Sequence, residues 1–118
     1  MKKKLIIKIG TSTLTAGTNR ISFAVIESLA RQIVELKKEF DIVIVSSGAI
    51  ATARQFVEIN GSHKNVDSKQ AMAAIGQTKL MELYDAIFRT FGLNIAQILL
   101  TYRDFENEVA NENTRNTI

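Results

Sequence analysis

Two short runs of apolar residues constrain the fold of this chain most. Leu5–Ile9 and Ile42–Val45 are rich in β-branched residues, and each predicts a buried strand. Between them, Ile21–Glu39 carries apolar residues at helical spacing, and Ser22 stands where an N-cap is expected. Apolar strands separated by a helix predict a parallel sheet, with right-handed crossovers and helices on both faces. The predicted fold class is therefore α/β.

The rest of the chain continues the alternation of helices and strands. We predict a helix over Ala49–Val57 and a polar loop over Asn60–Asn65. A third strand over Asn94–Leu100 follows, and a last helical stretch begins near Asp104.

A long helix is expected from Ser68 onward. Its apolar residues recur at helical spacing, as Met72, Ile75, Leu80, Leu83, Ile87 and Phe91. Gly92 is well placed to end it with a positive φ. Gly76 lies inside the helix, where glycine costs ~1 kcal/mol relative to alanine. A close helix crossing explains this glycine better than the approach of a ligand.

Composition excludes several classes of protein. With no cysteine and His63 as the sole histidine, the 118 residues cannot form disulfides or Cys/His metal sites, and a reducing cytoplasm is allowed. No segment approaches the ~20 apolar residues of a membrane span. Basic residues are not interleaved with aromatic ones, so neither a membrane nor a nucleic acid is an expected partner.

Small and hydroxyl residues follow each predicted strand, at Gly10–Ser12, Ser46–Gly48 and Thr101. In parallel α/β sheets, ligands bind outside the carboxyl ends of the strands. Lys8 lies one residue before such an end. Because a lone buried ammonium is costly, Lys8 either neutralises a phosphate or reaches water as an ordinary strand-end lysine.

The two strand-end segments each have a functional and a structural interpretation. Gly10–Ser12 can hold phosphate oxygens with N–H and hydroxyl donors, or it is a simple turn. It lacks the P-loop spacing. Ser46–Ala49 leads into a helix N-terminus that favours a bound carboxylate or phosphate. The alternative is an N-cap serine followed by a tightly packed glycine.

Taken together, these segments resemble the amino acid kinase family across nearly the whole chain. The resemblance is carried, in the family's order and spacing, by Lys8–Ser12, Val45–Ile50, Lys69–Ala71, Ala74–Gln77, Gln97–Thr101 and Asn113–Thr117. Within the family, they resemble the members that phosphorylate glutamate more than those acting on carbamate, acetylglutamate or uridylate.

The resemblance implies a three-layer αβα sandwich of the carbamate kinase type, with residues 1–118 as its N-terminal, substrate-binding part. It implies phosphoryl transfer from ATP, with Mg²⁺, to the side-chain carboxylate of L-glutamate, which begins proline biosynthesis. A cytoplasmic homodimer or homotetramer inhibited by proline is also implied. The catalytic lysine would be Lys8, and the ATP phosphates would lie against Lys8, Gly10, Thr11 and Ser12. Glutamate would contact Ser47, Gly48 and Ala49.

Departures from the family pattern leave other interpretations open. Tyr102 stands where the family has an arginine, with Arg103 next to it, and Ala53 replaces a glycine. The family's kinase domain extends well beyond residue 118, so we expect the nucleotide-binding half to be absent and this segment to be inactive alone. Alternatives are an amino acid kinase with a different carboxylate substrate and a non-catalytic module that binds anions or mediates oligomerisation.

Overall fold

The computed structural model describes residues 2–56 and 66–100, with side chains from 69 onward in the second range. Its elements are β1 (Lys3–Ile9), α1 (Thr11–Leu14), α2 (Phe23–Leu36), β2 (Phe40–Ser46), α3 (Ala49–Phe56) and α4 (Val66–Thr90). The predicted polar loop over Asn60–Asn65 and the helix near Asp104 lie outside the described residues.

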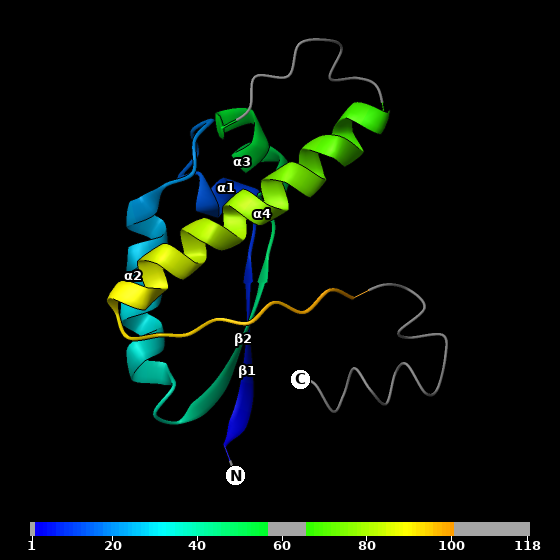
Figure 1. Cartoon of the computed structure of the whole chain (residues 1–118). Helices are drawn as coiled ribbons and strands as arrows, with labels where there is room; N and C mark the ends of the chain where they lie inside the picture. The colour runs from blue at the N-terminus through cyan, green and yellow to red at the C-terminus, as the bar shows by residue number, and fades with distance from the viewer. Residues whose placement is uncertain (1, 57–65, 101–118) are drawn as a thin grey trace, which may run out of the picture.

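The two strands form a parallel pair, in register from Lys3 beside Phe40 to Ile9 beside Ser46. The ladder continues one step further, because the Ser47 N–H donates to the Ile9 carbonyl at 2.9 Å. Both arrowheads in Figure 1 point toward α1 and α3. The α/β prediction is confirmed, and the carboxyl ends of both strands meet at one edge.

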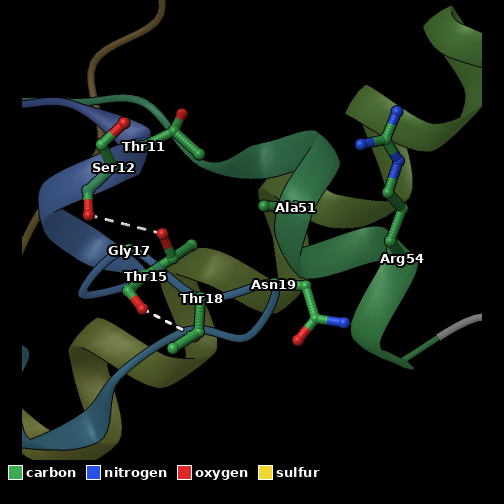
Figure 2. Close-up of a pocket in the computed structure, with 8 residues that line it drawn as sticks. All are labelled: Thr11, Ser12, Thr15, Gly17, Thr18, Asn19, Ala51 and Arg54. Carbon is green, nitrogen blue, oxygen red and sulfur yellow. Dashed lines mark hydrogen bonds between the residues drawn. The ribbon is translucent and has the colours of Figure 1, made fainter.

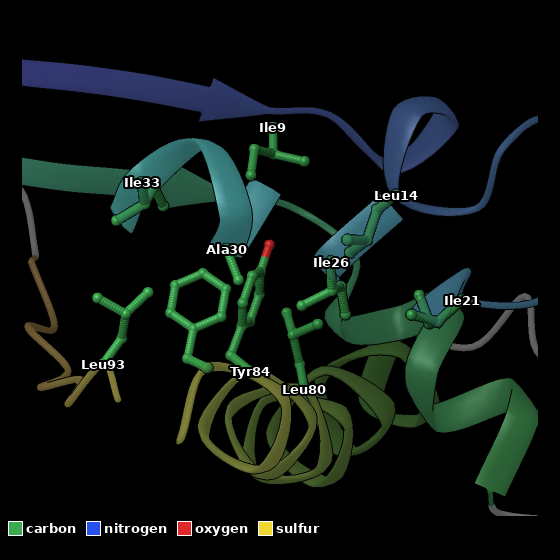
Figure 3. Close-up of a cluster of buried hydrophobic side chains, with 10 residues drawn as sticks. Ile9, Leu14, Ile21, Ile26, Ala30, Ile33, Leu80, Tyr84 and Leu93 are labelled. Carbon is green, nitrogen blue, oxygen red and sulfur yellow. The ribbon is translucent and has the colours of Figure 1, made fainter. Parts of the chain in front are cut away.

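Helices α2 and α4 pack on one face of the sheet around a common core. Figure 3 shows this cluster, which comprises Ile9, Leu14, Ile21, Ile26, Ala30, Ile33, Leu80, Tyr84, Phe88 and Leu93. The predicted N-cap of α2 is confirmed, since the Ser22 hydroxyl accepts a hydrogen bond from the Val25 N–H at 3.3 Å. One buried stripe of each helix thus meets the inner side chains of the strands.

The other face of the sheet is open within the described residues. Ile6 is 66% exposed and Val45 is 51% exposed, although both lie in strands predicted to be buried throughout. That prediction is wrong for the described part of the chain: side chains alternate between the core and the open face, as they do in any strand with one covered side. A third layer of the predicted sandwich stays a prediction.

The buried stripe of α4 advances in strict steps of four residues. It consists of Met72, Gly76, Leu80, Tyr84 and Phe88. The predicted stripe was partly wrong, because Ile75 is 40% exposed. Gly92 ends the helix with φ +73, as predicted. Its N–H donates to the Arg89 carbonyl and the Leu93 N–H donates to the Phe88 carbonyl, each at 3.0 Å. These two bonds close the last turn as a Schellman motif.

The predicted strand over Asn94–Leu100 is wrong, because these residues adopt no strand in the structure. Leu93 is buried, but Leu99 is 74% exposed. No backbone hydrogen bond joins the segment to β1 or β2 in the part of the chain that the structure describes. An apolar run predicts an extended segment, but a strand also needs a neighbouring edge with which to pair.

Candidate functional site

The carboxyl edge of the sheet gathers the segments that the sequence singles out. Gly10 directly follows β1 and Ser47 directly follows β2, and the two strands are hydrogen-bonded up to this point. Lys8 lies two residues before Gly10 and pairs with Val45. The residues predicted to bind phosphate and those predicted to bind the acyl substrate therefore lie at the same edge of the sheet.

After β1, the segment predicted as a turn begins a single helical turn, α1. Gly10 is the N-cap of α1, with φ −81 and ψ 163 and no capping side chain. The first helical bond runs from the Leu14 N–H to the Gly10 carbonyl at 3.0 Å. The N–H groups of Thr11, Ser12 and Thr13 precede this bond, so they are donors available to an anion.

Gly10 has no structural reason to be glycine within the described residues. Its φ is ordinary for any residue. A Cβ built on Gly10 would meet no atom within 4 Å. Neither backbone strain nor packing explains the residue, whereas a ligand that approaches the backbone closely would.

Gly48, in contrast, is required by the fold. Its φ is +108, and a Cβ there would lie 2.6 Å from Cδ2 of Leu14. Its carbonyl accepts from the buried Thr52 residue twice, from the N–H at 2.9 Å and from the hydroxyl at 2.7 Å. Gly48 directly precedes α3, so the interpretation of a serine N-cap is wrong and that of a tightly packed glycine is confirmed.

Helix α4 fixes the other side of this turn. A Cβ on Gly76 would lie 1.6 Å from the Ala49 carbonyl oxygen and 3.1 Å from Cβ of Ala53. The backbones of α3 and α4 therefore touch at the first residue of α3. The helix crossing predicted for Gly76 is confirmed, and it holds the N-terminus of α3 against the long helix.

Lys8 is exposed on the open face of the sheet. Within the described residues, no carboxylate lies within 4.0 Å of its ammonium. Ser46 faces the core, because its hydroxyl meets the Tyr84 hydroxyl at 2.7 Å. Strand alternation then favours Ser47 on the same face as Lys8.

A polar hollow lies beside this edge, between the α1 segment and α3 (Figure 2). Hydroxyl and amide side chains line it, and Arg54 of α3 is also among the lining residues, although its guanidinium points away from the α1 segment. The lining residues are Thr11, Ser12, Thr15, Gly17, Thr18, Asn19, Ala51 and Arg54. Sequence reasoning missed Arg54, although it is the only charged residue in the helix predicted over Ala49–Val57.

The described residues contain neither a metal cluster nor a membrane-spanning helix. No group of three His, Cys, Asp or Glu side chains there could hold a metal ion. None of the helices described is both long and apolar enough to cross a membrane.

The carboxyl ends of the two parallel strands, with their glycine and hydroxyl residues, form a candidate site for anionic ligands. Comparison with known families gives the class: the amino acid kinase family matches residues 3–118, so the chain belongs to the amino acid kinase family.

The chain is also similar to individual members of this family. The chain is 46% identical over 117 residues to the glutamate 5-kinase of Dehalococcoides mccartyi strain CBDB1, covering 98% of this chain and 31% of the relative. It is 41% identical, with the same coverage, to the glutamate 5-kinases of Geobacter sulfurreducens and Vibrio vulnificus. The chain spans about a third of the length of the curated relatives it matches.

Proposed function

We propose that this chain forms the acyl-substrate and phosphate-transfer part of a cytoplasmic glutamate 5-kinase. The reaction is ATP plus L-glutamate giving L-glutamyl 5-phosphate and ADP, the first step of proline biosynthesis. The observation that carries the proposal is Gly10, an unstrained and sterically free glycine at the carboxyl end of β1. It is supported by the named relatives, all of which are glutamate 5-kinases.

The proposed roles divide between the two strand ends. Beyond β1, Lys8 contacts the transferred phosphoryl group, and Gly10, Thr11 and Ser12 line the phosphate site. Beyond β2, Ser47, Gly48 and Ala49 contact glutamate. Since these strands are hydrogen-bonded neighbours, the two groups of residues lie close enough to present two substrates to each other.

The chemistry asks for positioning and charge stabilisation. A side-chain carboxylate oxygen of glutamate attacks the γ-phosphorus of ATP, and the bond from that phosphorus to the β,γ-bridging oxygen breaks. The carboxylate is already ionised, so no general base is needed. An ammonium and backbone N–H groups aimed at the phosphoryl oxygens would stabilise the charge that is redistributed during transfer.

Mg²⁺, further copies of the protein and proline have proposed roles as well. The described residues offer no cluster of carboxylates for a metal, so the proposal gives them no metal-binding role. Magnesium would arrive with the nucleotide phosphates, its usual ligands in kinases. The proposed assembly is a homo-oligomer, a dimer or a tetramer, with proline as a feedback inhibitor.

The test is substrate selectivity of the protein as its gene encodes it. The protein is incubated with ATP and Mg²⁺ and with glutamate, aspartate, acetylglutamate or carbamate, and acyl phosphate is trapped with hydroxylamine. We expect hydroxamate and ADP to form with glutamate alone. Product with another acceptor would identify a different member of the family. If no acceptor led to release of ADP, the result would support a non-catalytic anion-binding module.

A further inference from the structure

A buried hydroxyl pair ties the long helix to the end of β2. Tyr84 of α4 is only 4% exposed, and its hydroxyl lies 2.7 Å from that of Ser46, the last residue of the strand. Figure 3 shows the phenol reaching from α4 toward the strands. The Ser46 hydroxyl also lies 2.8 Å from the Ser47 carbonyl oxygen.

The donors in this chain of hydrogen bonds follow from counting protons. The Ser47 carbonyl can only accept, so the single Ser46 O–H donates to it. The Tyr84 O–H then donates to the Ser46 oxygen. Burial raises the pKa of Tyr84 above its ordinary value of 10.0, against a smaller lowering by the hydrogen bond to Ser46, so the phenol remains a neutral donor.

The two hydrogen bonds fix the orientation of the peptide plane between Ser47 and Gly48. The Ser47 carbonyl and the Gly48 N–H belong to one planar peptide group and point in opposite directions. Glycine tolerates both signs of φ, so the backbone at Gly48 permits a flip of this plane more readily than at other residues. A hydrogen bond that holds the Ser47 carbonyl therefore selects one direction for the Gly48 N–H.

The elements behind the hydroxyls are rigid. The Tyr84 ring packs edge-on against Phe88, with ring centroids 5.6 Å apart and planes at 87°. About two turns back from Tyr84 along α4, Gly76 is locked against Ala49 at the start of α3. The phenol is thus held in place relative to the same turn that it contacts.

We propose that Tyr84 is a positioning residue: through Ser46 it holds the Ser47–Gly48 peptide so that the Gly48 N–H faces the carboxylate of the bound substrate. The identity of that substrate rests on the proposed function. Tyr84 itself need not touch the substrate, because it acts through the backbone.

The kinetic test uses Tyr84→Phe in the protein as encoded, a change that removes one oxygen and leaves the ring. One hydrogen bond is worth about 0.5–1.5 kcal/mol, so we expect KM for glutamate to rise roughly 2- to 13-fold with KM for ATP unchanged. Ser46→Ala should raise the same constant, and the double variant should be no worse than the worse single one, since both act on one contact. Ile33→Val is the control, because it weakens the same core from α2 and leaves both the hydroxyls and the Phe88 ring in place.

A second measurement does not depend on activity. The amide resonance of Gly48 should shift or broaden in Tyr84→Phe and stay in place in Ile33→Val. An unchanged Gly48 amide in Tyr84→Phe, or an equal change in the Ile33 control, would overturn the positioning role. A wild-type protein that forms no glutamyl phosphate would instead overturn the proposed function, while the Gly48 amide still decides the positioning role.

Discussion

At the scale of single residues, three glycines near the sheet edge differ in what the structure demands of them. Gly48 needs a positive φ, and Gly76 leaves no room for a Cβ. Gly10 needs neither, since its backbone is ordinary and no atom of the described residues lies within 4 Å of a Cβ built there. The first two glycines fix the turn after β2, whereas Gly10 leaves the backbone of the proposed phosphate site open to a ligand.

Gly76→Ala should destabilise the protein although alanine favours a helix. The gain of ~1 kcal/mol in helix propensity is outweighed by a Cβ placed 1.6 Å from the Ala49 carbonyl, because separating α3 from α4 costs about 1–3 kcal/mol or more. Urea denaturation measures the difference. Thr78→Ala, an exposed change in the same helix, should be neutral or slightly stabilising. A Gly76→Ala protein as stable as that control would contradict the close crossing.

Gly10→Ala should separate function from stability. We expect the free energy of unfolding to change by no more than about 0.5 kcal/mol, as for a substitution that disturbs no contact. Glutamate-dependent turnover should fall at least roughly tenfold, because the new methyl group would occupy the space proposed for phosphate. Denaturation and hydroxamate assays on the same preparation provide the comparison. Full turnover in this variant would remove the main support for the phosphate site.

The alkaline titration of Tyr84 gives a third prediction. Its pKa is raised in the folded state, so the neutral phenol stabilises the fold below pH 10.0, and this contribution is lost as pH rises through the raised pKa. Tyrosinate absorbance should therefore show one phenol that ionises above the ordinary range, or only on unfolding, and Tyr84→Phe should lack it. An ordinary titration curve for every tyrosine of the folded wild type would refute this.

Some residues of the site could be predicted and others could not. Lys8, Gly10 and Ser47 are visible because they stand at the ends of recognisable strands. Tyr84 was missed since the helix was interpreted from its aliphatic residues, while the buried stripe advances by fours and includes a tyrosine with a polar partner. That partner, Ser46, is 38 positions away in sequence, and only the folded chain brings the two together.

At the scale of elements, local patterns predicted α2, α3, α4 and the first two strands to within a few residues, but not the single turn of α1. Their capping residues, Ser22 and Gly92, carry the signal in their own chemistry. The strand over Asn94–Leu100 failed because strand formation depends on a partner that the segment's own sequence does not specify.

Ser22→Ala tests how α2 begins. Loss of the side-chain bond to the Val25 N–H should cost about 1 kcal/mol, whereas Ser22→Gly should cost only a few tenths. Thermal unfolding followed by circular dichroism gives both values. Ser28→Ala, exposed on the same helix, serves as the matched control and should change little. Equal losses in Ser22→Ala and Ser28→Ala would argue against a specific cap.

At the scale of the whole molecule, one sheet edge carries the proposed chemistry, and one sheet face is open as far as residues 2–56 and 66–100 show. The edge is defined by two parallel strands that end together, as the register shows. The open face exposes Ile6 and Val45 next to Lys8, in a chain that spans about a third of its relatives' length. The proposed function therefore places the acyl and phosphate ends of the reaction in this chain.

The central claim is that the ammonium of Lys8 contacts the transferred phosphoryl group. Comparison of Lys8→Ala with Lys4→Ala tests this claim most directly. Both lysines are exposed in β1 and on one face, but Lys4 lies far from the carboxyl edge. In the protein as encoded, we predict that Lys8→Ala lowers kcat for glutamyl phosphate formation roughly 10²- to 10³-fold with little loss of stability, and that Lys4→Ala changes neither. Equal turnover in the two variants would contradict the account.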